Sequence, residues 1–555
     1  MPMPTVTDLL SKARRVCGQE WPVLLVACLS AGIFASQCAF LGDAKIDDAF
    51  ITFSYSKNLA LGNGPVYSHG VRVEGYSTFL WMILVTLPLI FTRGAAPLGM
   101  ARVVAAPFLA LLGWSVYRLA RACGAPRGAA ALTMLLLSFS TDLAAAYLTG
   151  METVPYTALL VFAVSATLLS RAEPRWQKWA AWGGLAVGLG RIDGFLPWAV
   201  MGGWSLWGVV RQGTSQDVRR FLRTYGPPVA LYVIWFLWRW HYYGLFLPST
   251  YYAKALLPKI MPQRGTEYLL GEVSGGALWC GLVAWLWLLW RHRTRAALIG
   301  CYVLIHWAYV VAVGGDWMPF GRFVLPTVPF LAVLLVVASA DAIAEACRPR
   351  GRVLWLPSAA FLGLAALFAA RIDHRVLNSD VEKGKVAGVA EQTANVDSYL
   401  RAARFLAEVV PSGGRLVTDY GGVFACYTDA AIIEMWGLAN AAIATRGGTE
   451  RINPIYGRTC PECYPELEPE YFHVMQPMVR REPAFTSAAQ VITSVWQTDT
   501  IGRYIDFPAT FTVGRALAPE TNEALYFLQR RGGALKVERR ITPGGLVIDY
   551  PFEKT

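Results

Sequence analysis

Two adjacent carboxylates, Asp47 and Asp48, are the side chains in this sequence whose type and spacing most directly suggest chemistry. They lie near the start of a polar stretch, residues 43–81, between two apolar segments. Carboxylates at a membrane surface are costly to place, and such groups are concentrated at functional sites. The alternative is a solvated loop in which Asp47 is the N-cap of a helix. The spacing alone leaves both interpretations open.

The composition is that of a polytopic membrane protein. Of the 555 residues, 55% are hydrophobic and only 16% are charged, whereas a soluble domain usually has about 25% charged residues. The 21 Trp and 24 Tyr residues suit a protein with two membrane interfaces, where these side chains are enriched. The net charge of +12 comes from Arg residues in short clusters between apolar segments. That pattern is typical of cytoplasmic loops and not of a nucleic-acid-binding protein.

The order of the apolar segments predicts how the chain crosses the membrane. Basic residues precede a first apolar run that has about the 20 residues a bilayer requires, so we expect an uncleaved helix with its N-terminus inside. The next apolar segment is short, and treating residues 78–92 as an in-plane or re-entrant helix places every later Arg cluster inside. The expected spans, about eleven in all, are residues 21–41, 100–118, 129–148, 154–170, 179–192, 194–210, 226–243, 275–290, 296–313, 323–342 and 353–370.

The character of the chain changes after about residue 370, where hydrophobicity falls and acidic residues reappear. We therefore expect an α-helical membrane module over residues 1–370, with its external loop at 43–77, followed by an extracytoplasmic mixed α/β domain over residues 371–555. In that domain the patterns predict a helix at 396–410, a strand at 415–418 and a second strand at 431–435, which suggests βαβ-like units.

Three cysteines, Cys426, Cys460 and Cys463, lie in the part of the chain that is expected outside, where a disulfide can persist. Cys460-Pro-Glu-Cys463 resembles half of a zinc ribbon or a redox motif, but no second CxxC is present, so a metal site is disfavoured. A local disulfide, or one from Cys426 to either of the other two, is expected instead.

An outward-facing pair of carboxylates with several cations suits transfer of a sugar from a polyprenyl-phosphate donor. The reaction needs a base for the acceptor hydroxyl, which Asp47 or Asp48 would supply, and positive charge over the leaving phosphate. The cations on the expected outer face are Arg191, Lys254 and Arg322. The residues expected to bind sugar or acceptor, or to orient the cations, are Arg72, Glu74, Tyr76, Glu152, Asp193, Tyr251, Asp316 and Trp317. For a single aromatic residue the alternative is anchoring at the membrane interface, and for a single Arg it is ion pairing within the bundle.

Two other classes of protein compete with a transferase. A flippase or transporter of lipid-linked sugars would use the acidic loop as a gate, but the sequence has no convincing internal repeat of the kind many transporters show. A scaffold would use the membrane part only as an anchor, and the concentration of polar groups on one face disfavours it. A large external α/β domain fits acceptor binding better than transport.

The stretch 43–81 resembles the first external loop of GT-C glycosyltransferases. Besides the Asp pair, the similar residues there are Tyr55, Asn58-Leu59-Ala60, Gly62-Asn63-Gly64-Pro65-Val66 and Arg72-Val73-Glu74. Further motifs follow in the order of that family, namely Gly150-Met151-Glu152-Thr153, Arg191-Ile192-Asp193-Gly194, Tyr242-Tyr243-Gly244 with Pro248-Ser249-Thr250 and Lys254, Gly315-Asp316-Trp317-Met318-Pro319 with Arg322, and Glu434-Met435-Trp436-Gly437-Leu438. The chain is most similar to the group with the terminal arabinofuranosyltransferase of mycobacterial cell-wall synthesis. Gly75-Tyr76-Ser77 departs from the Ala-Asn-Thr of that group, in a loop expected to touch the acceptor.

The resemblance implies a GT-C fold and an inverting transferase in the bacterial cytoplasmic (inner) membrane, with the C-terminal domain outside. It implies a polyprenyl-phosphate sugar as donor, with arabinofuranose as the best candidate, and a cell-envelope glycan or a protein as acceptor. In such enzymes the first Asp of the loop acts as the base, which here is Asp47, while Asp48 would support it. No cofactor is implied, and a divalent cation is compatible with the sequence but not required by it.

Overall fold

A computed structural model gives the structure of the chain. It describes residues 6–212, 214–254, 261–316, 318, 320–347, 355–371, 388–419, 421–447, 460–473, 479–482, 484–485, 487–494, 501, 503–533 and 538–552.

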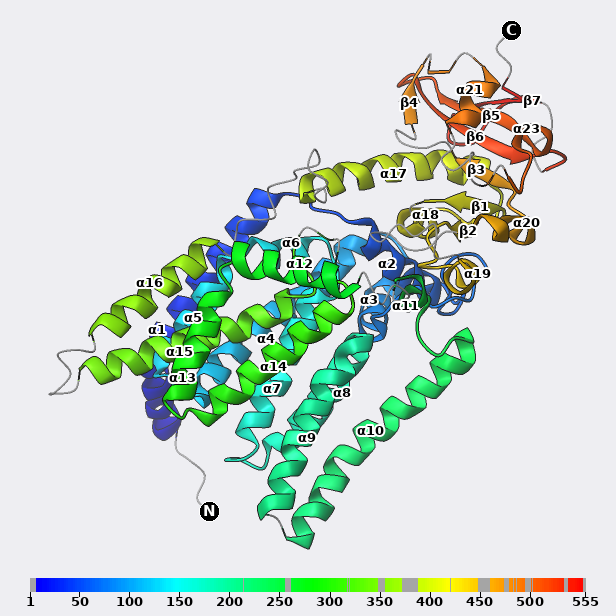
Figure 1. Cartoon of the computed structure of the whole chain (residues 1–555). Coiled ribbons are helices and arrows are strands. Elements are labelled where there is room, and N and C mark those ends of the chain that lie inside the picture. Colours follow the sequence, from blue (N-terminus) through cyan, green and yellow to red (C-terminus); the bar gives the residue numbers. More distant parts are fainter. Residues whose placement is uncertain are drawn as a thin grey trace. The chain divides into compact units, whose positions relative to one another are not determined.

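Apolar helices build the first of two compact units, which comprises Met1–Asp43, Ala105–Tyr232 and Ile260–Gly388 (Figure 1). The helices that lie in it, with α4 and α10 continuing beyond its boundaries, are α1 (Val6–Leu41), α4 (Pro97–Ala122), α5 (Arg127–Ser138), α6 (Thr141–Leu148), α7 (Thr153–Leu169), α8 (Trp176–Gly190), η1 (Ile192–Gly194), α9 (Phe195–Gln212), α10 (Ser215–Tyr243), α12 (Met261–Gly275), α13 (Trp279–Trp290), α14 (Thr294–Ala312), η2 (Leu325–Thr327), α15 (Val328–Ala346) and α16 (Trp355–Arg371).

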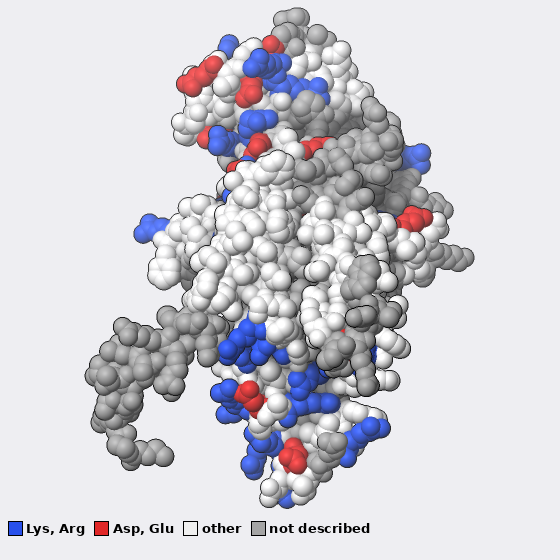
Figure 2. All heavy atoms as spheres, turned by 90° about the vertical axis from the view of Figure 1, so that its left-hand side faces the viewer, with Lys and Arg blue, Asp and Glu red and all other residues white. Residues whose placement is uncertain are grey.

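These helices confirm a multi-pass membrane protein. Among the described residues, 4 helices are long and apolar enough to cross a membrane, or up to 6 if each of two bent helix pairs is one span. The count of about eleven spans stays a prediction. On the face that Figure 2 shows, a broad area without charged side chains ends at its lower edge in a group of Lys and Arg, the distribution expected where a bilayer core meets its basic flank.

Two of the expected spans are not single straight helices. The span expected at residues 129–148 is built from two helices, because α5 and α6 meet at a bend of 62°, and its course through the membrane stays a prediction. The side chain of Ser140 accepts a hydrogen bond from the N–H of Leu143 (3.1 Å) and starts a new helix there. The span expected from residue 275 begins instead at Trp279, and α12 precedes it at a bend of 83°.

The second compact unit comprises Ala44–Val104, Val233–Lys259 and Val389–Thr555, so it joins the acidic loop to the C-terminal region. Its first helices are α2 (Asp47–Ala60), α3 (Phe79–Thr92) and α11 (Ser249–Lys254). The helix expected at residues 78–92 is thus present as α3, whereas its orientation in the membrane stays a prediction. The domain boundary expected after residue 370 also stays a prediction.

A mixed sheet of eight strands forms the C-terminal region, in the order β2-β1-β3-β6-β5-β8-β7 with β4 also paired to β6. The strands are β1 (Arg415–Thr418), β2 (Ala431–Glu434), β3 (Tyr471–His473), β4 (Val479–Arg481), β5 (Phe511–Ala518), β6 (Glu523–Arg530), β7 (Glu538–Ile541) and β8 (Val547–Tyr550). The helices are α17 (Val389–Val409), α18 (Gly421–Tyr427), α19 (Ala441–Arg446), η5 (Pro461–Cys463), α20 (Tyr464–Leu467), α21 (Ala488–Thr493) and α23 (Phe507–Thr510).

Strands β1 and β2 run parallel and are connected through α18, which confirms the expected βαβ unit. Strand β3 also pairs with β1 in parallel, while β5, β6, β7 and β8 pair antiparallel. The predicted helix at 396–410 is present as the longer α17. Cys460 and Cys463 form a disulfide, and Cys426 is a buried free thiol in α18.

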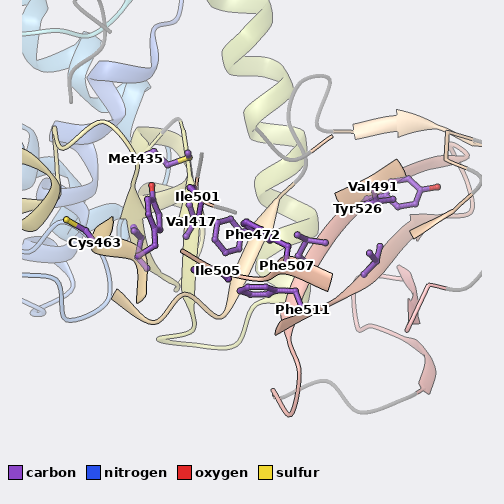
Figure 3. Packing of buried hydrophobic residues seen from close by; sticks show 14 of the residues in the cluster. Val417, Met435, Cys463, Phe472, Val491, Ile501, Ile505, Phe507, Phe511 and Tyr526 are labelled. Carbon is purple, nitrogen blue, oxygen red and sulfur yellow. The ribbon is translucent and has the colours of Figure 1, made fainter. Parts of the chain in front are cut away.

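The core of this region is built around an aromatic cluster on β3, α23 and β5 (Figure 3). The ring of Phe472 meets the rings of Phe507 and Phe511 edge-on, each at a centroid distance of 5.2 Å. Such edge-to-face pairs add to the free energy that apolar burial contributes.

Phe472→Ala is expected to destabilise this region by about 3–5 kcal/mol, because it removes a ring that is 2% exposed from a packed core. Hydrogen exchange of the β3 and β6 amides in the purified full chain measures the loss as faster exchange. Tyr504→Ala, at a position 46% exposed, is the control and should leave the exchange rates nearly unchanged. Equal rates in both variants would contradict the assignment of Phe472 to the core.

Candidate active site

Helix α2 places the acidic pair at its first two positions. Asp47 starts the helix, its side chain does not cap it, and the N-cap is Ile46. The Asp47 side chain is 7% exposed, so the alternative of a solvated N-cap is wrong. Its carboxylate instead accepts hydrogen bonds from two backbone N–H groups of α18, from Gly422 to Oδ2 (3.1 Å) and from Val423 to Oδ1 (2.9 Å).

Burial makes the Asp47 carboxyl a group that titrates near neutrality. Desolvation raises its pKa from 3.8 to about 7, although the two N–H groups act in the opposite direction by stabilising the charged form. The neighbouring carboxylates Asp48 and Asp419 raise the pKa further. A general base works best when its pKa lies near the operating pH, and Asp47 meets that condition.

The loop that follows α2 is held against it by buried tyrosines. The hydroxyl of Tyr55 donates to the carbonyl of Val73 (2.5 Å) and accepts from the N–H of Gly75 (2.8 Å). The hydroxyl of Tyr76 lies 3.2 Å from that of Tyr243, which donates to the carbonyl of Pro65 (2.8 Å). Tyr76, predicted to contact the acceptor, is therefore buried in this network.

Glu74 forms a buried ion pair with Arg239 near the end of α10. The Nε of Arg239 donates to Oε1 (3.0 Å) and Oε2 (2.9 Å) of the carboxylate, and its Nη1 donates to the carbonyl of Phe246 (2.7 Å). The two side chains are 2% and 0% exposed. A buried carboxylate needs such a partner, so the pair gives Glu74 a structural role, and its part in acceptor binding stays a prediction.

The motif Glu434–Leu438 of the C-terminal region lies against the same loop. The Glu434 carboxylate accepts from the N–H groups of Trp436 (2.8 Å) and Ala439 (3.1 Å), which closes a tight turn. The hydroxyl of Ser249 lies within donating distance of the carbonyl oxygens of Glu74 (2.9 Å) and Leu438 (2.6 Å) and shares its hydrogen between them. Three of the motifs on which the family resemblance rests therefore meet in the second unit.

The first unit holds a separate cluster of charges at the turn between α8 and α9. The guanidinium of Arg191 donates from Nε to Asp193 (2.9 Å) and from Nη1 to Glu152 (2.9 Å), and all three side chains are buried. A guanidinium has five N–H donors, so donors remain for a further anion. The structure thus brings together three residues predicted for the site.

Arg322 belongs to the same cluster, because it and Arg191 both contact the ring of Phe323, a residue that sequence reasoning missed. It pairs with Asp316 (2.8 Å), and its guanidinium stacks on Phe323 at 5.1 Å. The guanidinium of Arg191 stacks on the same ring at 4.9 Å. One phenyl ring therefore gathers two of the three predicted phosphate-binding cations. Trp317 lies outside the described residues.

The other predicted residues lie in the second unit. Lys254 ends α11 and is half-buried, and Tyr251 on the same helix is exposed. Arg72 is exposed and lies over the ring of Tyr242 at 5.6 Å. The structure therefore does not place Lys254 in the same unit as Arg191 and Arg322.

Sequence reasoning missed Arg239, Val423 and Phe323 as members of these clusters, and it named Glu434 only as part of a family motif. Arg239 carried a usable signal, because an ionisable residue within an apolar run calls for a partner. Gly422 and Val423 carried none, because backbone N–H groups have no side-chain signature. Within the described part of the chain, no three His, Cys, Asp or Glu side chains form a group that could hold a metal ion.

A curated protein is similar in sequence to part of this chain. No protein-family model matches the chain. A terminal β-(1→2)-arabinofuranosyltransferase of Corynebacterium glutamicum is 29% identical over 354 residues, which are 56% of this chain and 50% of that protein. The chain thus spans about half the length of the curated relative it matches.

Two solved structures share the fold. The oligosaccharyltransferase of Archaeoglobus fulgidus aligns with a TM-score of 0.53 over 94% of this chain and 76% of that chain, at 11% identity. ArnT of Cupriavidus metallidurans, solved with undecaprenyl phosphate, aligns with a TM-score of 0.50 over 76% of this chain and 88% of that chain, at 14% identity. In fold the chain therefore resembles GT-C membrane glycosyltransferases, and in sequence it is similar to a terminal arabinofuranosyltransferase.

Proposed function

We propose that the protein is a membrane glycosyltransferase that moves a sugar, with arabinofuranose as the first candidate, from a polyprenyl-phosphate donor to a cell-envelope glycan or another hydroxyl-bearing acceptor. The observation that carries the proposal is the Asp47 carboxyl, buried at the head of α2 with its pKa near 7. Further support comes from the arabinofuranosyltransferase relative and from a solved fold neighbour that holds undecaprenyl phosphate.

In the proposed reaction Asp47 accepts the proton of the acceptor hydroxyl as the oxygen attacks the anomeric carbon. The bond between that carbon and the phosphate oxygen breaks, and polyprenyl phosphate leaves with the electron pair. Attack from the face opposite the leaving group inverts the configuration. The neighbouring Asp48 carboxylate raises the pKa of Asp47 and so favours acceptance of the proton.

The leaving phosphate needs compensating charge, and we assign this role to Arg191 and Arg322. Each is already oriented by a carboxylate, Arg191 by Glu152 and Asp193 and Arg322 by Asp316. An arginine fixed in this way loses little conformational entropy when it binds a phosphate, and its planar fork suits two oxygens. Lys254 would add a point charge.

The test is a transfer assay with the purified chain, several polyprenyl-phosphate sugars including arabinofuranose, and a mixed glycan acceptor. The expected result is a labelled glycan with one donor. If no donor supports transfer but labelled lipid crosses the membrane of proteoliposomes, the protein is a flippase and the proposal is wrong.

The pH dependence follows from the pKa of Asp47. Below pH 7 the base is protonated, so kcat/KM is expected to rise about tenfold per pH unit up to a plateau above about pH 7.

The contribution of the buried carboxyls to the free energy of unfolding should fall as the pH rises. Burial raises the pKa of both Asp47 and Glu434 to about 7, so the folded state binds more protons than the unfolded one between about pH 4 and pH 7.

The contribution of these two groups to stability is thus fully present below about pH 4 and is lost as the pH rises through about 7. Rate profiles and thermal unfolding of the same sample measure both trends. A plateau that already extends to pH 5 would contradict Asp47 as the titrating base.

A further inference from the structure

The N-terminal end of helix α18 faces the carboxylate of Asp47 with its backbone N–H groups. The first N–H groups of any helix have no partner within the helix. In α18 the N–H groups of Gly422 and Val423 both point to Asp47, one to each carboxylate oxygen. The carboxylate has about four lone-pair sites, so one site on each oxygen remains for another hydrogen.

The opposite end of α18 is held by the same partner helix, α2. The Nζ of Lys57 donates to the carbonyl of Cys426 (2.6 Å) and lies 5.8 Å from the centroid of the Tyr427 ring. An anion at the N-terminus and a cation at the C-terminus both complement the helix dipole. Asp47 and Lys57 thus fix α18 along α2 at both of its ends.

Close packing against α2 and the loop after it leaves no room for a Cβ at the first two residues of α18. A Cβ at Gly422 would lie 2.2 Å from the carbonyl oxygen of Asp47 and 3.0 Å from the nitrogen of Ile51. A Cβ at Gly421 would lie 2.0 Å from the hydroxyl of Tyr67. Both glycines are therefore required for backbone N–H groups to reach the carboxylate.

We propose that α18 is a positioning element for the base, in which Gly422 and Val423 orient the Asp47 carboxylate through their N–H groups and Lys57 keeps the helix in register. The inference rests on the proposed transferase function. It assigns to the C-terminal region an indirect part in the chemistry, because the N–H groups of Gly422 and Val423 decide where the remaining lone pairs of the Asp47 carboxylate point. Gly422 itself is 375 positions away from Asp47.

Several other titratable groups also interact with the Asp47 carboxyl, so an experiment on its pKa must leave them in place. The titratable groups that interact with Asp47 are Asp48 on α2, Tyr67 in the loop after it, Asp419 after β1, Cys426 on α18 and Glu434 on β2. None of these groups is replaced in a variant at Val423, so a shift in the midpoint relative to a control that keeps the N–H reports the loss of that N–H.

Val423→Pro is the decisive variant, because proline lacks the N–H and is tolerated in the first turn of a helix, here after a glycine. Loss of one hydrogen bond to the charged form should raise the midpoint of the acid limb of kcat/KM by about one pH unit or more. We also expect kcat to fall about 10–100-fold with the acceptor KM nearly unchanged, because the misplaced group acts in the transition state.

The matched control is Val423→Ala, which shortens the same side chain but keeps the N–H. Its midpoint should stay at about pH 7, whatever its overall rate. Equal midpoints in the two variants would overturn the positioning role while leaving the transferase intact. A wild-type chain without transfer from any donor would overturn both proposals.

A second pair of variants covers the case in which Val423→Pro does not fold. Lys57→Met releases the far end of α18, so the midpoint should rise by about half a pH unit, and Lys57→Arg should restore it. If Lys57→Met loses thermal stability but keeps the wild-type midpoint, α18 only holds the fold together and the inference is wrong.

Discussion

Asp47→Asn is expected to lower kcat/KM for sugar transfer by about 10²–10⁴-fold, because an amide cannot take the proton of the acceptor hydroxyl. The protein should remain folded. The amide oxygen can still accept the N–H of Val423 or Gly422, and the neutral side chain is easier to bury than a carboxylate. Transfer from a labelled donor, measured beside the thermal unfolding of the same sample, separates the two effects.

Two further variants make the assignment specific. Asp43→Asn changes an exposed carboxylate four residues upstream and should leave the rate unchanged. Asp48→Asn removes only the neighbour, so a smaller loss is expected. If Asp48→Asn abolished transfer while Asp47→Asn did not, the base would be Asp48.

Arg239→Ala is expected to destabilise the second unit by about 3–5 kcal/mol, because it leaves Glu74 as an uncompensated charge in the interior. It also removes the donor to the carbonyl of Phe246. Thermal unfolding of the detergent-purified chain measures the loss. Arg223→Ala, at an exposed position on the same helix, is the control and should have little effect.

A double variant distinguishes a structural role of the Glu74–Arg239 ion pair from a role of Glu74 in binding the acceptor. Glu74→Leu with Arg239→Leu replaces both charges by apolar groups, which is often neutral for stability, so most of the loss should be recovered. If Glu74 also binds the acceptor, the recovered protein will have a raised acceptor KM. A stable double variant with an unchanged KM would reject that role, and an unstable one would contradict the structural role of the pair.

Much of the helical architecture could be predicted from apolar segment lengths alone. The two strands at 415–418 and 431–434 were also predictable, because their apolar patterns are local, whereas helix α18 between them was not predicted. The break between α5 and α6 was not foreseen, because hydropathy averages over the Ser140 cap that redirects the chain. The number of spans is open for the same reason, since bent pairs such as α12 and α13 count as one span or as two.

The chemistry of the site was predictable only in part, because its decisive contacts are long-range. The types of the side chains were enough to select Asp47, Asp48 and Arg191 as candidates. The structure adds the groups that surround them. The N–H groups that hold Asp47 belong to Gly422 and Val423, and no local pattern links positions so far apart. The stacking of Arg191 and Arg322 on Phe323 likewise depends on tertiary packing.

The bonds between Asp47 and α18 also have a consequence for how the chain matures. They join residues 375 and 376 positions apart. At a synthesis rate of roughly 5–20 residues per second, α2 leaves the ribosome roughly 20–75 seconds before its partner exists. Throughout that interval the carboxylate lacks its two N–H donors while the intervening helices are made. With the proposed roles of Asp47 and α18, we expect transfer activity to begin only after translation has delivered α18.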